Sequence, residues 1–136
     1  MIAVDLAQLE LSDAWVDGDE RSRWRTTAAL TPADGTRASG SVLLEVDPEH
    51  RLEPHTDSAE ETIVVLAGTA EVVVGGEAGE VASGGLALVP ADVVHEVRNA
   101  GREPLRFVAF YAGADVVTRY ARPVAPDGAA ERRPLE

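Results

Sequence analysis

Residues 54–68, "PHTDSAEETIVVLAG", place four ionisable side chains directly ahead of an apolar run that ends in glycine. The apolar run is typical of a buried β-strand, and an unpaired charge costs several kcal/mol to bury in such a place. His55, Asp57 and Glu61 therefore need a compensating partner. We predict that this partner is a metal ion held where the strand begins.

Short apolar runs of the same kind recur along the chain, each bounded by Gly, Pro, Asp or Asn. None keeps a 3.6-residue apolar period over ten residues, so we expect little helix, limited to single turns near residues 5–9 and 115–119. Residues 72–81, "VVVGGEAGEV", indicate a hairpin because both central glycines tolerate positive φ. Many short strands with such turns predict an all-β antiparallel barrel or sandwich, and 136 residues suffice for a single domain.

The composition excludes several kinds of function. All 12 basic residues are arginine, and with 24 acidic residues the formal net charge is −12, so we expect no nucleic acid partner and no anionic membrane surface. Without lysine or cysteine the chain has no side-chain Schiff base, thiolate nucleophile or disulfide. No apolar run approaches the roughly 18 residues needed to cross a bilayer, and we expect a cytoplasmic protein.

Two segments supply candidate metal ligands. Side chains alternate along a strand, so His55 and Asp57 share one face, and Glu61 joins them if the strand direction continues through residues 58–60. Residues 84–99, "GGLALVPADVVHEVRN", place His95 at the start of another strand, just after a Pro-bounded turn. Two imidazoles with one or two carboxylates form the ligand set of many Fe(II), Mn, Ni, Co and Zn sites, so a divalent metal ion is the expected cofactor.

These two segments resemble the two conserved motifs of the cupin superfamily. The first family motif has Gly, five residues, His-x-His, three or four residues, Glu, six residues and Gly; the chain has Glu49, His55, Asp57, Glu61 and Gly68 at these positions. The second has Gly, five residues, Pro-x-Gly, two residues, His, three residues and Asn; the chain has Gly84, Pro90, Asp92, His95 and Asn99. Together the motifs cover residues 49–99.

The resemblance implies a single-domain antiparallel jelly-roll β-barrel of the cupin type, with a divalent metal in the barrel mouth. It carries over His55, Glu61 and His95 as metal ligands. We expect the barrel over residues 21–115, an N-terminal extension over residues 1–20, and a partly mobile C-terminal extension over residues 116–136. Cupins often form homodimers, and the N-terminal region offers these apolar residues for such a contact: Leu9, Leu11, Trp15 and Val16.

Three positions depart from the family pattern. Glu49 and Asp92 replace turn glycines, and we expect both to adopt ordinary turn conformations. Asp57 replaces a metal-binding histidine. If Asp57 coordinates, two carboxylates make the site of a divalent ion formally neutral, which weakens the Lewis acid and favours Mn, Fe(II) or Ni. If it acts from outside the coordination sphere, His55, Glu61 and His95 remain as a two-His, one-carboxylate triad with open positions.

Other candidate residues have two interpretations each. Arg21, Arg23 and Arg25 alternate with Trp24 along one expected strand. They form either a cationic edge for a carboxylate or phenolate substrate, or an arginine-rich edge strand that discourages aggregation; we favour the second. Tyr111 shares a strand face with two apolar neighbours and either lines the pocket or packs in the core. Glu60 and His50 are expected on the surface and on a loop, outside the site.

The expected function is that of a metal-dependent cupin enzyme acting on an oxygenated small molecule. Family relatives include dioxygenases, isomerases, decarboxylases and cyclase-like proteins, and the residues do not choose among these. Candidate proton-transfer groups are Glu61, Asp57 and Tyr111. The alternative is a non-catalytic cupin module that binds or senses a small ligand.

Overall fold

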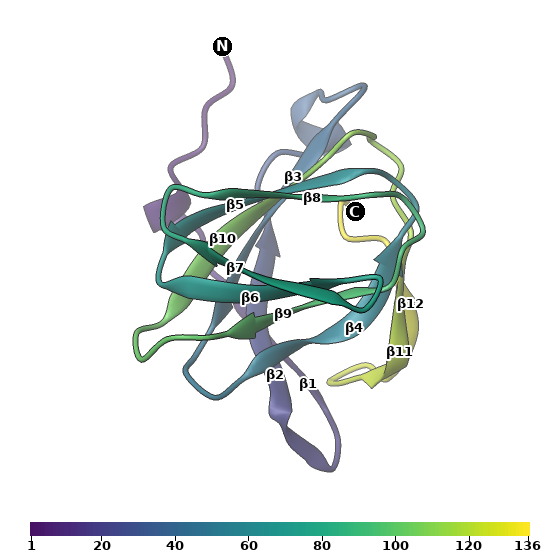
Figure 1. The fold of residues 1–136 in the computed structure, drawn as a ribbon. Helices are drawn as coiled ribbons and strands as arrows, with labels where there is room; N and C mark the ends of the chain where they lie inside the picture. The colour runs from purple at the N-terminus through teal and green to yellow at the C-terminus, as the bar shows by residue number, and fades with distance from the viewer.

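The computed structural model describes all 136 residues and contains strands, turns and two short 3-10 helices, η1 (Leu6–Gln8) and η2 (Pro32–Asp34), but no α-helix. This confirms the all-β prediction (Figure 1). The strands are β1 (Ser12–Val16), β2 (Asp19–Ala28), β3 (Gly40–Val46), β4 (Arg51–Asp57), β5 (Glu61–Ala67), β6 (Thr69–Val74), β7 (Glu77–Ala82), β8 (Leu86–Val89), β9 (His95–Asn99), β10 (Leu105–Tyr111), β11 (Thr118–Val124) and β12 (Ala129–Arg132). The helical turn expected near residues 5–9 is present as η1, whereas the one at 115–119 is wrong, because β11 begins at Thr118.

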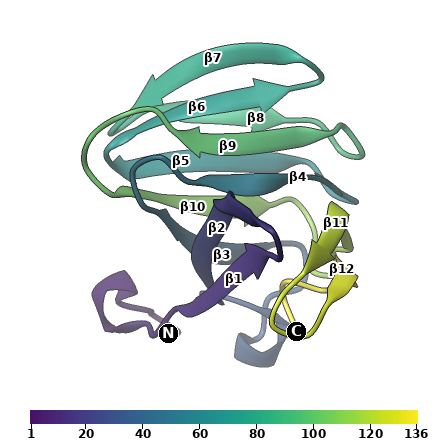
Figure 2. The same cartoon turned by 90° about the horizontal axis from the view of Figure 1, so that it is seen from below.

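The strands form one curled sheet in the order β7-β6-β9-β4-β2-β3-β10-β5-β8, which makes a nearly closed barrel (Figures 1 and 2). Neighbouring strands run antiparallel, except for one parallel bridge between β2 and β4. Strand β1 pairs with β2, and β11 pairs with both β4 and β12. This arrangement is the jelly-roll barrel that the resemblance to cupins implies.

Alternation with period two builds the core. On β3 the side chains of Val42, Leu44 and Val46 point inward, and on β10 those of Phe107 and Tyr111 do the same. Phe110, between the last two, is 46% exposed on the outer face. A closed barrel places one face of every strand in the same core, so the inward side chain of each strand reaches the others.

Tight turns keep the glycine-type backbone even where glycine is absent. The β6–β7 hairpin turns through Gly75 and Gly76 with φ of 58° and 84°, as predicted. Glu49 and Asp92 have φ of 70° and 61°, so the expectation of ordinary turn conformations is wrong. A left-handed conformation costs such residues about 1 kcal/mol. The Asp92 amide donates to the carbonyl of Asp57 at 2.8 Å, which ties this strained turn to the end of β4.

The C-terminal segment is built into the barrel mouth. Thr118 and Tyr120 of β11 pair with Asp57 and His55 of β4, and Leu135, only 4% exposed, packs over Gly40. Figure 2 shows β11 and β12 together at the side of the barrel, next to β4. Backbone pairing with β4 and between β11 and β12 holds this segment together with the buried side chains of Val116, Val124 and Leu135.

The arginine-rich strand β2 is not an edge strand, because it pairs with β1 and β3 and bridges to β4. The edge interpretation is therefore wrong. Arg25 binds Asp47 and Glu45 on neighbouring β3 and its following turn, while Arg21 and Arg23 are exposed. No helix in the structure is long and apolar enough to cross a membrane.

Candidate metal centre

Three strands bring the four candidate ligands together at one end of the barrel. His55 and Asp57 end β4, Glu61 begins β5, and His95 begins β9. His55 and His95 are paired directly across β4 and β9. All four side chains are buried, with residue exposures of 2% to 5%. The site therefore has the burial expected of a metal centre and not of a solvated surface cluster.

The ligand atoms lie close to one another. His95 Nε2 is 3.0 Å from Glu61 Oε1 and 3.2 Å from Asp57 Oδ2, while His55 Nε2 is 3.4 Å from the same Asp57 oxygen. The imidazole ring centroids of the two histidines are 4.1 Å apart. Both imidazoles can therefore contact one common atom. The ligand atoms of His55, Asp57 and His95 all lie within 4.8 Å of one another, and Glu61 reaches this group through His95.

Backbone carbonyls orient both imidazoles. His55 Nδ1 lies 2.7 Å from the carbonyl oxygen of Glu53, and His95 Nδ1 lies 2.9 Å from that of Val93. A carbonyl only accepts, so each Nδ1 carries the hydrogen and donates it. Each Nε2 is then available on the side facing the carboxylates. This is the arrangement in which histidine binds a metal through Nε2 while the other nitrogen fixes the ring.

Several polar atoms of the cluster have no partner. Asp57 Oδ2, Glu61 Oε1 and His95 Nε2 are buried without a hydrogen bond, although they lie 3.0–3.2 Å from one another across His95. His95 Nε2 is thus close to both carboxylate oxygens, but the angles are not those of hydrogen bonds. Buried polar atoms are normally satisfied, so a converging set of unsatisfied ones indicates that something else binds there. A divalent cation fits these two nitrogens and two carboxylates.

The electrostatics of the cluster match that conclusion. Burial alone would lower the pKa of His95, but the carboxylates of Asp57 and Glu61 outweigh it and raise that pKa to about 10. Burial would likewise raise the pKa of Asp57, but the close imidazoles of His55 and His95 outweigh it and hold that pKa well below its usual range. Without a metal ion a proton on His95 therefore supplies the positive charge that the carboxylates require.

Asp57 uses its two oxygens differently. Oδ1 accepts a hydrogen bond from the Thr118 hydroxyl, whereas Oδ2 faces the two imidazoles and has no hydrogen bond. The first oxygen is anchored and the second is available as a ligand. Sequence reasoning missed Thr118, and it also missed Tyr120, whose ring lies 5.2 Å from that of His55. Thr118 and Tyr120 lie two positions apart, which is the spacing of one strand face, and this spacing was the available signal. The prolines of the same C-terminal segment argue against a strand.

Tyr111 lies beside the cluster. It faces Glu61 across β10 and β5 and is 5% exposed. Burial, together with the negative charges of Glu61 and Asp57, raises the pKa of Tyr111 well above its usual value of 10. Its hydroxyl therefore stays protonated. The structure thus places all three predicted proton-transfer candidates together.

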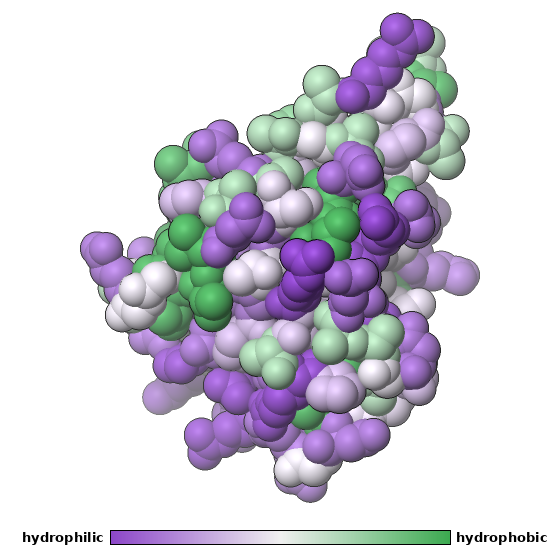
Figure 3. Space-filling model, turned by 90° about the vertical axis from the view of Figure 1, so that its right-hand side faces the viewer, coloured by the Kyte–Doolittle hydropathy of each residue, from purple (hydrophilic) through white to green (hydrophobic).

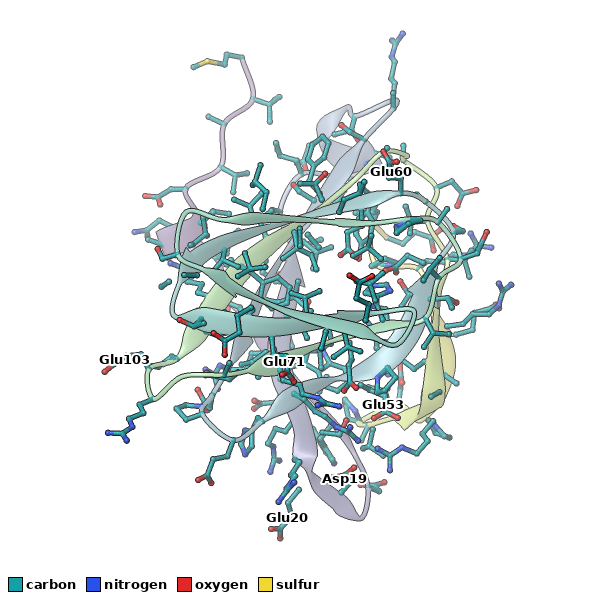
Figure 4. The ribbon with its side chains drawn as sticks, viewed as in Figure 1. Asp19, Glu20, Glu53, Glu60, Glu71 and Glu103 are labelled. Atoms are coloured by element: carbon teal, nitrogen blue, oxygen red, sulfur yellow. The ribbon has the colours of Figure 1, made fainter.

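A second buried acidic group lies on the same strand. Glu53 is fully buried, and its carboxylate accepts hydrogen bonds from Ser22 Oγ at 2.7 Å and from Arg122 Nε and Nη2 at 2.7 and 2.8 Å. Arg122 also binds Asp19 at 2.7 Å. Figure 4 shows Glu53 on β4 and Asp19 near the β1–β2 turn. Nothing in the motif pattern identified this network, because its arginine comes from the C-terminal segment.

The remaining predicted positions lie outside the centre. Glu60 is exposed on the loop before β5, where Figure 4 labels it at the periphery. His50 lies on the β3–β4 turn, beside a polar depression that Arg21 also lines. Figure 3 looks onto the right-hand side of Figure 1, where β6 turns into β7, and shows small apolar patches among mostly hydrophilic side chains.

A family model described as a cupin domain matches residues 42–111, which are 70 of the 136 residues. The chain belongs to this cupin family. The matched region contains all four candidate ligands and Tyr111, but neither Thr118 nor Arg122. No curated protein matches the sequence.

Solved structures share the fold at low identity. The oxalate decarboxylase of Lactobacillus farciminis, in a formate complex, is 17% identical with a TM-score of 0.71, over 85% of this chain and 34% of its own. A putative sugar phosphate isomerase from Acidithiobacillus ferrooxidans is 21% identical with a TM-score of 0.64, over 85% of this chain and 76% of its own. The Bacillus subtilis oxalate decarboxylase, in a study of its Mn(II) centres, is 21% identical with a TM-score of 0.64, over 79% of this chain and 30% of its own. This chain spans about a third of the oxalate decarboxylases, and the likeness concerns the fold.

Proposed function

We propose that this cupin is a metal-dependent enzyme that acts on a small oxygenated substrate. The observation that carries the proposal is the buried cluster in which unsatisfied atoms of Asp57, Glu61 and His95 converge beside His55. Such a cluster is costly to maintain without a ligand, because buried polar groups normally have partners. A bound cation would satisfy all of them at once.

The residues that would hold the ion are two imidazoles and two carboxylates: His55, His95, Asp57 and Glu61. This set suits Mn, Fe(II), Ni, Co or Zn, and its two carboxylates favour the ions that prefer oxygen. The Mn(II) centres named for the Bacillus subtilis oxalate decarboxylase support a divalent ion of this group. When bound, such an ion polarises a carbonyl or enolate oxygen of the substrate.

The protein groups divide the proton chemistry. Tyr111 faces Glu61 across β10 and β5, so it is the candidate donor. Glu61 and Asp57 are the candidate acceptors, and the Thr118 hydroxyl holds Asp57 in place. The reaction class is a dioxygenase, isomerase or cyclase-like conversion. Decarboxylation joins these candidates, since the structural neighbours are named as an oxalate decarboxylase and a putative sugar phosphate isomerase.

Reconstitution tests this proposal. Metal-free protein is loaded in turn with Mn, Fe(II), Co, Ni and Zn and incubated with oxalate, a 1,3-diketone, a catechol and an aldose phosphate. Oxygen uptake, carbon dioxide release and isomer formation are followed together. We expect turnover of one substrate class with at least one metal, and its loss in His95→Ala. Absence of turnover with every metal would contradict an enzymatic role on these substrates.

One observation favours the alternative, a non-catalytic module. The four ligand residues are 2% to 5% exposed, and none lines the cavity that lies beside them. A site closed in this way suits a structural metal in a ligand-binding barrel. Removal of the metal distinguishes the two functions. A structural ion stabilises the fold and resists chelators, and ligand binding does not require it. A catalytic ion is required for turnover.

We also propose that the partner is a second copy of this chain. Leu86 and Leu88 of β8 are 65% and 61% exposed, and Phe110 of β10 is 46% exposed. Thr62 of β5 pairs with Leu88 of β8 and with Phe110 of β10. Leu88, Thr62 and Phe110 therefore form one row across the three strands. Residues 86–89 carry no charge in a chain of net charge −12, and a self-complementary apolar face suits a two-fold dimer. Light scattering should show a dimer that Leu88→Ser weakens; a monomer at every concentration would contradict this.

A further inference from the structure

A cavity of about 210 Å³ lies next to the metal centre. Its wall combines inward side chains of β2 and β3 with residues of β10, β11 and the C-terminal segment. The family match ends at residue 111, so β11 and the C-terminus add a wall that the matched region does not supply. The cavity therefore takes part of its wall from outside the matched region.

Three wall residues separate the cavity from the metal ligands. The Thr118 hydroxyl donates to Asp57, the Tyr120 ring lies 5.2 Å from that of His55, and Tyr111 faces Glu61 across the sheet. All three line the cavity, whereas the four ligand residues do not. A molecule in the cavity would thus lie one side chain away from the centre.

The wall is rich in hydrogen-bond donors. Trp24 is 2% exposed and lines the cavity, and its Nε1–H is buried without any partner. The other tryptophan, Trp15, donates its Nε1–H to Asp17 at 3.0 Å. An indole N–H only donates, and Tyr111 and Tyr120 add two hydroxyl donors to the same wall. The complementary ligand must present acceptor oxygens.

The side chains that line the cavity carry more positive than negative charge. Arg132 and Arg133 both line the cavity, against Glu136 as the one acidic side chain of the wall. Over the whole chain, by contrast, acidic residues outnumber arginines by 24 to 12. The partners of these two arginines, Asp127 and Asp115, are 60% and 85% exposed, so their charges are screened by water.

The size restricts the ligand further. At roughly 30 Å³ for each water molecule, about 210 Å³ corresponds to some seven waters. This is smaller than the ~300–1,000 Å³ of ordinary drug-sized ligand sites. We propose that the cavity binds a small carboxylate of a few carbon atoms, whose oxygens accept from the Trp24 N–H and the tyrosine hydroxyls.

This inference goes beyond the proposed function, since it assigns a binding site for small carboxylic acids next to the metal centre. It does not rest on the proposed function, because none of the wall residues is a metal ligand. None of the four metal ligands lines the cavity, so carboxylate binding is expected in both metal-free and metal-loaded protein. A failure of metal binding and a failure of carboxylate binding are therefore separate results.

The test uses the two indole N–H signals in the proton–nitrogen spectrum of the full chain, assigned with Trp15→Phe. Acetate and oxalate are titrated into metal-free and metal-loaded protein, and acetamide serves as the neutral control. We expect a saturable shift of the Trp24 signal with the acids, and weaker binding of acetamide. Tyr120→Phe should weaken acid binding at least about 10-fold, since a hydrogen bond to a charged group is lost. Trp15→Phe should leave binding unchanged.

Three outcomes would overturn the inference. These are the absence of any saturable Trp24 shift, equal binding of acetamide and acetate, and unchanged affinity in Tyr120→Phe. Metal content, measured on the same samples, shows independently whether the metal centre is formed.

Discussion

Two acidic side chains on the same strand, Glu53 and Asp57, are both buried, yet their surroundings differ. The Glu53 carboxylate accepts three hydrogen bonds at 2.7–2.8 Å from Ser22 and Arg122. Asp57 has one oxygen bound by Thr118, while the other faces two imidazoles without a hydrogen bond. A permanent positive charge of the protein neutralises Glu53. The only possible positive charges beside Asp57 are imidazoles, and one of its oxygens has no hydrogen bond. The comparison teaches that burial alone does not mark a functional site; an unsatisfied buried group does.

The difference comes from the neighbouring strands. Arg122 of β11 reaches Glu53 with a permanent charge, whereas the groups facing Asp57 are histidines, whose charge depends on a proton. A guanidinium cannot be replaced by a metal ion, but a proton on imidazole can. We therefore expect changes near Glu53 to affect stability and changes near Asp57 to affect metal binding.

The largest expected effect is on stability. Arg122→Gln removes both guanidinium hydrogen bonds of the buried Glu53 and leaves Arg51, at 3.9 Å, as its only cation; it should lower the free energy of unfolding of the metal-free protein by about 3 kcal/mol, as for other broken buried ion pairs. Arg119→Gln is the matched control, because the Arg119–Glu131 pair on the same strand is 61% and 60% exposed. Its loss should cost at most about 1 kcal/mol. Urea denaturation measures the free energy of unfolding of both variants. Equal losses in the two would contradict the difference between the buried and the exposed ion pair.

The next effect is on metal affinity. His95→Ala removes one imidazole and should weaken binding of Mn or Ni at least about 100-fold, beyond the usual effect of losing an outer hydrogen bond. His50→Ala should leave the affinity unchanged, because His50 lies on the β3–β4 turn outside the cluster. Competition with a chelator measures both variants. An unchanged affinity in His95→Ala would show that the ion binds elsewhere.

A finer comparison addresses the two oxygens of Asp57. Asp57→Asn replaces a charged ligand oxygen by a neutral one and should weaken metal binding by about 10- to 100-fold. Thr118→Val keeps the carboxylate and removes only its anchor, so it should weaken binding by about 10-fold or less. The same chelator competition ranks the two variants. If Thr118→Val is the more harmful, Asp57 is not a direct ligand.

The last effect is a dependence on pH, which is small for each single pH unit. The pKa of His95 in the folded, metal-free protein is about 10, above its ordinary value near 6.5, so its stabilising contribution is complete below about pH 6.5 and is lost as pH rises toward 10. The slope for one proton is at most about 1.4 kcal/mol per pH unit. Unfolding measured from pH 6 to 10 should show this decline, and His95→Gln should not. A flat profile in the unchanged protein would contradict the assigned charges.

Much of the barrel and the ligand set was predictable because both depend on local patterns. Period-two alternation and the β6–β7 glycine turn indicated strands, and motif spacing located His55 and His95. The surrounding shell was not predictable, since it depends on β11 pairing with β4 across 61 residues, between Asp57 and Thr118. The conformations of Glu49 and Asp92 were missed, although the motif glycines that these residues replace were a signal for a positive φ.

The most direct test of the account is a crystal structure of the metal-loaded protein with anomalous diffraction at the absorption edge of the metal. The account predicts one ion per chain, bound by Nε2 of His55, Nε2 of His95 and at least one carboxylate oxygen, at about 2.0–2.2 Å in the case of zinc. An ion bound elsewhere, or both Nε2 atoms without a metal at saturating concentration, would contradict it.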